Sequence, residues 1–324
     1  MNKEEFIRLA AEHIHEYLPD DYRGAKVDVM ERTKTNDILL HGLTIHKGDK
    51  DKEAVPIIYL EPYYNAYHLE GKDMEDIMHE IARDYQKISR DIPDFDFPEM
   101  TKEGIRNRVF VKMVNSRSNT ESLRDLVRLP VEGGFTLTAY IDMDAFNGNA
   151  MIQITRDMAK GMGYDERELM EDAMRNTVSA HPAKLVEMHK VMMDMAGLRK
   201  LEPEDNLLSE NSGPAGDLTM LILSNSDLYF GATALFYPEI KRQIADVTGG
   251  SFYVLPSSVH ELIVLPDRGS HDEKALAKMV KTVNSSEVAP DEQLGNKLLY
   301  YNAAQNRLTV AVDLDKQKER GEER

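Results

Sequence analysis

Residues 251–266 have the sequence SFYVLPSSVHELIVLP, two short apolar runs joined by a polar corner. Each run has the length of a strand, is rich in β-branched and aromatic residues, and carries a proline at its far end. The pattern predicts a buried β-hairpin. Its corner, Ser257 to Glu261, holds two hydroxyls, an imidazole and a carboxylate, the densest group of potentially reactive side chains in the sequence.

Ser257, Ser258, His260 and Glu261 are therefore the candidate catalytic residues, and two interpretations stay open. A hydrolase would use one serine as nucleophile and His260 as base, with a carboxylate orienting the imidazole. Adjacent residues rarely adopt that geometry, because side chains that begin a strand leave on opposite faces, and the sequence has no Gly-x-Ser-x-Gly elbow. We favour the other interpretation, in which the serines close the turn and His260 and Glu261 satisfy buried polar groups.

Composition limits the classes of partner and chemistry. The chain has 324 residues and 41% hydrophobic content, enough for a sizeable core and about two domains. A net charge of -17 opposes binding to nucleic acid or to an anionic membrane. The absence of cysteine excludes disulfides, thiolate zinc sites and a cysteine nucleophile. We predict no nucleic-acid partner, no cofactor and no metal.

The beginning of the sequence and its helical patterns contain no targeting or zinc-protease signal. The chain starts directly with an amphipathic pattern, and no apolar run approaches the roughly 18 residues of a membrane helix. We therefore expect a cytoplasmic protein that does not bind membranes. His79 and Glu80 begin like a zinc-protease signature, but Arg83 stands where the second histidine should be.

Hairpin patterns recur along the chain. Strands are expected as a hairpin over residues 24–46 and then at 55–60, 109–114, 135–141, 151–154, 218–223, 298–301 and 308–312. Helices are expected at 2–18, 73–89, 119–127, 232–247 and 271–283, the last with Ser270 as its N-cap and Glu273 three residues later. Because strands occur as adjacent hairpins, we predict an α+β fold of mostly antiparallel sheets with packed helices, in one body or two subdomains.

Residues 155–198 are rich in methionine and helical by pattern, with Pro182 beginning a new helix. Flexible thioethers either fill irregular cores or form adaptable docking surfaces, and both interpretations stay open. Met188, Met192 and Met195 are the candidate interaction surface.

Charge and helix breakers place a candidate linker at residues 201–217. We expect an N-terminal α+β region over 1–200 and a C-terminal α+β region over 218–314. The charged tail, 315–324, is expected to be disordered.

Three groups of residues resemble a known family: GATAL at 231–235, FYVLPSSVHE at 252–261, and Asn284 with the stretch 298–302. The chain resembles an uncharacterised bacterial family, catalogued as a domain of unknown function, that carries a Leu-Pro-Ser-Ser-Val-His-Glu signature and is typical of Gram-positive anaerobes. Phe230 stands where the resemblance leads us to expect a smaller polar residue, usually Asn. The resemblance implies a bacterial cytoplasmic protein with a common fold, and no established activity or cofactor.

Two hypotheses about function follow, with a weaker third. The favoured one is a non-enzymatic cytoplasmic protein that binds another protein or acts as an accessory to it, because the surface is acidic, the helices are methionine-rich and no catalytic motif is assembled. The alternative is a hydrolase that uses Ser257 or Ser258 with His260. The third is a metal site built from His, Asp and Glu.

Overall fold

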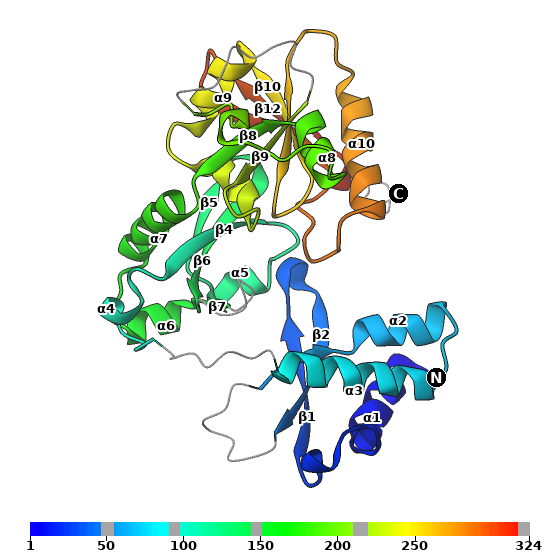
Figure 1. Ribbon diagram of the computed structural model, residues 1–324. Coiled ribbons are helices and arrows are strands. Elements are labelled where there is room, and N and C mark those ends of the chain that lie inside the picture. Colours follow the sequence, from blue (N-terminus) through cyan, green and yellow to red (C-terminus); the bar gives the residue numbers. More distant parts are fainter. Residues whose placement is uncertain (47–54, 91–97, 144–150, 210–219, 317–324) are drawn as a thin grey trace. The chain divides into compact units, whose positions relative to one another are not determined.

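A computed structural model describes residues 1–46, 55–90, 98–143, 151–209 and 220–316. Backbone contacts divide the chain into two units, shown in Figure 1. Unit 1 comprises Met1–Lys34 and Ile38–Asp96, and unit 2 comprises Thr35–Asp37 and Phe97–Arg324. Each unit has its own sheet structure and its own buried side chains.

Unit 1 contains a three-stranded antiparallel sheet. Strand β1 (Lys26–Thr33) pairs with β2 (Leu39–His46), and β2 pairs with β3 (Ile58–Tyr59). The predicted hairpin over residues 24–46 is therefore confirmed. The helices of this part of the chain are α1 (Lys3–His13), η1 (Ile14–Tyr17), η2 (Asp20–Tyr22), α2 (Glu61–Leu69) and α3 (Met74–Arg90), and the turn between β1 and β2 is η3 (Thr35–Asp37).

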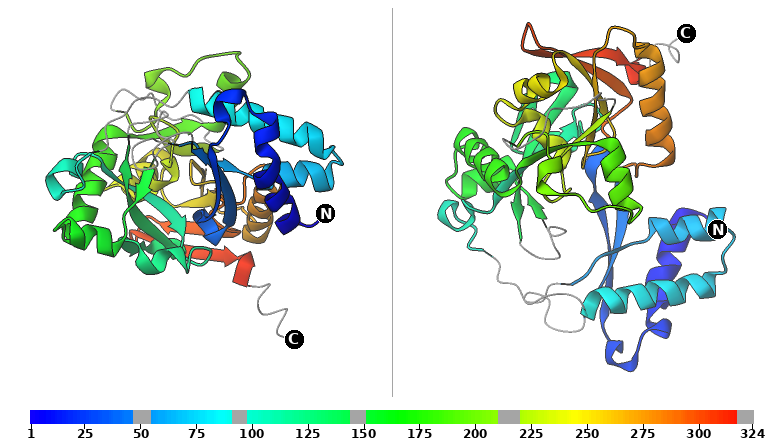
Figure 2. Two further views of the ribbon diagram at one scale, coloured as in Figure 1. Left: turned by 90° about the horizontal axis from the view of Figure 1, so that it is seen from below. Right: turned by 45° about the horizontal axis from the view of Figure 1, so that its top comes forward.

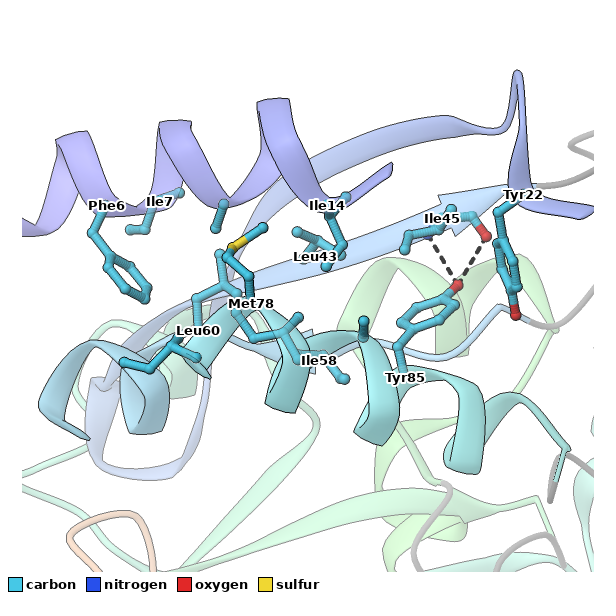
Figure 3. Packing of buried hydrophobic residues seen from close by; sticks show 14 of the residues in the cluster. Phe6, Ile7, Ile14, Tyr22, Leu43, Ile45, Ile58, Leu60, Met78 and Tyr85 are labelled. Atoms are coloured by element: carbon cyan, nitrogen blue, oxygen red, sulfur yellow. Dashed lines mark hydrogen bonds between the residues drawn. The ribbon is translucent and has the colours of Figure 1, made fainter. Parts of the chain in front are cut away.

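The core of unit 1 forms where two amphipathic helices cover one side of the hairpin. Figure 2 shows α1 and α3 on the same side of β1 and β2. Phe6 of α1 and Ile77 and Ile81 of α3 are completely buried there. The Tyr85 hydroxyl donates to the Ile45 carbonyl at 2.8 Å and accepts from the Ile45 N–H at 3.0 Å (Figure 3). This pair of bonds attaches α3 to strand β2.

Unit 2 contains a six-stranded antiparallel sheet with the stretch 251–266 near its centre. The strand order is β13-β12-β10-β11-β9-β8. Their bounds are β8 (Ala183–Glu187), β9 (Leu221–Asn225), β10 (Phe252–Pro256), β11 (Leu262–Pro266), β12 (Lys297–Asn302) and β13 (Arg307–Asp313). Phe252 pairs with Pro266 and Pro256 pairs with Leu262, which confirms the predicted hairpin.

A second sheet in unit 2 is built around β6 (Phe135–Asp142), which pairs with β4 (Val109–Asn115), β5 (Arg128–Val131) and β7 (Met151–Gln153). The remaining helices are α4 (Lys102–Ile105), α5 (Ser122–Asp125), η4 (Glu132–Gly134), α6 (Arg156–Gly161), α7 (Glu166–Ala180), α8 (Met188–Met195), η5 (Pro203–Asp205), η6 (Gly231–Phe236), α9 (Ile240–Thr248) and α10 (Glu273–Ser286). The predicted α+β class with antiparallel sheets is confirmed.

Two helices cover the sheets of unit 2. Helix α7 runs along β4, where the Thr177 hydroxyl accepts from the Val111 N–H at 2.9 Å. Helix α10 lies against the six-stranded sheet (Figure 1), and its Leu276 and Val280 pack with Leu255 and Leu298 of the strands. These contacts bury one apolar side of each helix.

Two local predictions are wrong. Pro182 does not begin a helix, because Ala183–Glu187 forms strand β8, which pairs with β9 and buries Leu185 and Val186. Pairing with an existing sheet edge outweighs the local helical spacing of these residues. The N-cap of α10 is Asp272, whose side chain accepts from the Lys274 and Ala275 N–H groups, and not Ser270.

The candidate linker at 201–217 lies between two paired strands, β8 and β9. Its residues from 210 lie outside the described part, but Asp205 and Leu207 before them are buried. The expected regions 1–200 and 218–314 stay predictions about domains. Of the expected disordered tail, residues 317–324 lie outside the described residues.

Candidate functional site

The corner between β10 and β11 is closed by hydrogen bonds within the turn itself. The Ser258 N–H donates to the Glu261 carbonyl at 3.2 Å. The Ser258 hydroxyl oxygen accepts from the His260 N–H at 3.1 Å. A serine side chain that accepts a backbone N–H two residues later is a common way to stabilise a turn.

Neighbouring segments of unit 2 also form hydrogen bonds with the residues of this turn. The Val259 N–H donates to the Glu292 carbonyl at 2.9 Å, and the Ala232 N–H donates to the Val259 carbonyl at 3.2 Å. The Ser224 hydroxyl donates to the His260 carbonyl at 2.8 Å. The polar groups of the turn are therefore paired largely with backbone atoms, as buried polar groups generally are.

Gly231 allows the chain to approach this turn closely. A Cβ atom at Gly231 would lie 2.1 Å from Ser224 Oγ and 2.5 Å from the His260 carbonyl oxygen, distances that real atoms do not adopt. Phe230, immediately before it, has a left-handed backbone with φ +50°. Asn is favoured over bulky residues in that conformation. The Asn expected here from the resemblance therefore has a backbone explanation.

Both nitrogens of the His260 ring have partners other than the serine hydroxyls. Its Nδ1 accepts from the Phe230 N–H at 3.3 Å, and its Nε2 lies 3.4 Å from the Glu292 carboxylate. The ring also stacks on Phe230, with an interplanar angle of 8°. An Nδ1 atom that accepts a hydrogen bond carries no proton. The geometry therefore assigns the tautomer with its proton on Nε2, the nitrogen near Glu292.

These positions do not provide the contact that a serine hydrolase needs. A nucleophilic hydroxyl must lie within hydrogen-bonding reach of the imidazole base. The Ser258 hydroxyl is engaged by the backbone, and Ser257 lines a cavity of about 20 Å³ beside α10, room for about one water molecule. The arrangement favours the structural interpretation of the turn.

The carboxylate next to His260 in sequence is not the one next to its ring. Glu261 is partly buried, and burial raises the pKa of its carboxyl above the ordinary value, although His260 opposes the shift. Glu292 faces the ring instead. The sequence carries no local signal for this pair, because the two residues lie 32 positions apart and their segments meet through tertiary contacts, the Val259–Glu292 backbone hydrogen bond and the bridge between Ser258 and Gln293.

Lys297 is a buried charged residue that the sequence reasoning missed. Its Nζ donates to the Gly133 and Gly134 carbonyls at 3.0 and 3.2 Å and lies 3.8 Å from the centroid of the Phe135 ring. Burial lowers the pKa of Lys297 to about 8. The Gly133-Gly134 pair predicts a turn, but nothing in the sequence indicates that a lysine from β12 attaches to it.

The candidate interaction residues on α8 differ in exposure. Met192 and Met195 are 63% and 83% exposed, whereas Met188 is half-buried. No residue of α8 is buried. We call the following exposed side chains the methionine surface: Met192, Met193, Met195 and Leu198.

In the described part of the chain, no group of three or more His, Asp or Glu residues could hold a metal ion. No helix within those residues has the length and apolar character needed to cross a membrane.

Comparisons with curated proteins and with solved structures found no match. A family model does match residues 3–303, and its description is a family of unknown function. The chain therefore belongs to the DUF5688 family.

Proposed function

We propose that this chain is a non-enzymatic cytoplasmic protein of bacteria that binds another protein through the methionine surface at the end of α8. The single observation that supports the proposal is the exposure of these apolar side chains, up to 83% at Met195. Grouped exposed apolar side chains are typical of interaction sites. Methionine suits such a site because its flexible, polarisable thioether adapts to the shape of a partner.

Ion pairs connect helix α8 to the neighbouring segments of unit 2. Lys190 contacts Glu187 at 2.8 Å and Asp205 at 3.1 Å, and Arg199 contacts Asp205 at 2.8 Å. Burial acts to raise the pKa of Asp205, but hydrogen bonds from Arg199, the Glu202 N–H and Lys190 outweigh it and lower this pKa to about 2. The helix is thus anchored without using Met192 or Met195, and its exposed apolar side chains remain available to a partner.

The partner that fits this surface is a protein with an apolar groove or an apolar helix face. Such a partner would bury the thioethers, and each fully buried apolar side chain contributes about 1.5–3 kcal/mol. The acidic composition and the lack of cysteine support a cytoplasmic setting. The resemblance of residues 252–261 supports a bacterial source.

The test compares binding by the full chain and by the double variant Met192→Glu, Met195→Glu. We expect a specific protein to co-purify from native lysate with the wild type and to be lost from the variant, because two carboxylates in an apolar interface would be desolvated. Both sites are exposed, so unfolding free energy should change by less than about 0.5 kcal/mol.

The matched control is Leu69→Glu, which changes a side chain in unit 1 that is 75% exposed. This variant should retain the partner. Equal co-purification with wild type and with the double variant would contradict the proposal, as would equal loss from the control.

A further inference from the structure

Unit 2 contains an apolar groove, separate from α8, between α7 and β5. It encloses about 1020 Å³, at the upper end of the range typical of small-molecule sites. Its apolar lining comes from α7, the edge strand β5 and the segment before α9: Leu129, Met170, Met174, Val178 and Pro238.

Helix α7 has two apolar sides. One side, with Leu169, Ala173 and Thr177, is fully buried and includes the contact with β4. Met170, Met174 and Val178 follow one another at four-residue steps and so form a second stripe on the helix. This stripe lines the groove, and Leu129 beside it is 48% exposed.

The charged groups that line the groove differ in their partners. Its two carboxylates are both paired, Glu171 with Arg167 at 3.0 Å and Glu166 with Arg156 at 3.8 Å, and Arg175 contacts Asp172. Arg128 instead donates to the Leu123 carbonyl, and among the described residues no carboxylate lies within ion-pair distance of it. A guanidinium without a carboxylate partner thus borders an apolar groove, in a chain whose net charge is -17.

We infer that the groove binds a small anionic amphiphile, a carboxylate with a long apolar chain. The Arg128 guanidinium pairs with the carboxylate, which it can contact through two parallel hydrogen bonds. Leu129, Met170 and Met174 contact the apolar chain. An added peptide strand fits less well, because β5 contains Pro130, which has no N–H to donate to a neighbouring strand.

Calorimetric titration of the purified full chain with dodecanoate, dodecanol and dodecyltrimethylammonium, all as monomers, tests the assignment. Dodecanoate should bind with a stoichiometry of one and at least about tenfold more tightly than the other two, because only it pairs with Arg128.

Arg128→Gln should weaken dodecanoate binding by about tenfold and leave dodecanol binding unchanged. Met174→Gln should weaken both ligands, because it places an amide in the apolar lining. Arg8→Gln, an exposed arginine of unit 1, is the matched control and should change neither. Thermal unfolding of each variant confirms that the fold is retained.

Three outcomes would overturn the inference. One is a lack of dodecanoate binding by the folded wild type. Another is equal affinity for the acid and the alcohol, which would show an apolar groove without selectivity for an anion. The third is dodecanoate binding that neither Arg128→Gln nor Met174→Gln weakens, which would place the ligand elsewhere.

Discussion

The turn between β10 and β11 and the methionine-bearing helices α7 and α8 differ in how their side chains are used. The turn has the more reactive residue types, but the Ser258 hydroxyl and the His260 ring are engaged by backbone groups and Glu292. The helices offer only thioethers and aliphatic groups, but several of these are exposed or line a groove. This difference indicates that, in this protein, whether a side chain is exposed and without partners is a better guide to function than the chemical reactivity of its residue type.

The largest expected effect is that of Gly231→Ala. A Cβ atom there overlaps Ser224 Oγ and the His260 carbonyl, so the turn must move or lose its hydrogen bonds. We expect the free energy of unfolding to fall by about 3 kcal/mol, measured by chemical denaturation.

Gly161→Ala is the control, because no atom lies within 4 Å of the added methyl and α6 is helical there. It should be neutral or stabilising by up to about 1 kcal/mol. Equal stability of the two variants would show that the turn is not tightly held.

A smaller loss is expected for His260→Ala. The change removes the acceptor of the Phe230 N–H and the stacked ring, which together should cost about 2 kcal/mol. Urea midpoints compared with those of His15→Ala, an exposed histidine of unit 1, measure this cost. If His260→Ala matches the wild type in stability, the imidazole does not stabilise the turn. Its side chain would then be available for another role, like the exposed side chains of α7 and α8.

The smallest effect is expected for Glu261→Gln, and its sign depends on pH. Burial raises the pKa of Glu261 in the folded state, so the folded chain binds this proton more tightly than the unfolded chain. The contribution of Glu261 to the free energy of unfolding is therefore favourable at low pH. This contribution decreases as the pH rises above 4.5, the ordinary pKa of a glutamate side chain.

Removing the charge should raise stability near pH 7 by at most about 1 kcal/mol and make no difference near pH 4. Denaturation of both chains at the two pH values checks this. Destabilisation by Glu261→Gln at pH 7 would mean that the carboxylate has a charged partner and is not simply buried.

Much of the fold could be predicted from local pattern. Alternating apolar residues identified the hairpins of β1 with β2, β10 with β11 and β12 with β13, and three- and four-residue spacing identified α3 and α10. Strand β8 was predicted as a helix, because its short sequence is compatible with either period and its pairing partner lies beyond the candidate linker. At the site, the four candidate residues were identified by their types, but the contacts of His260 with Glu292 and Phe230 were not.

The sequence by itself determined the antiparallel α+β class, the position of the central hairpin and the exclusion of cysteine chemistry, because these depend on residue type and on periodicity over a few neighbours. Only the tertiary structure decided which polar groups were engaged and which methionines stayed exposed. Met170 is buried and Met195 is exposed although both occur in similar helical patterns. The physical reason is that burial depends on which distant segment packs against a face, and one chain's local pattern does not specify that segment.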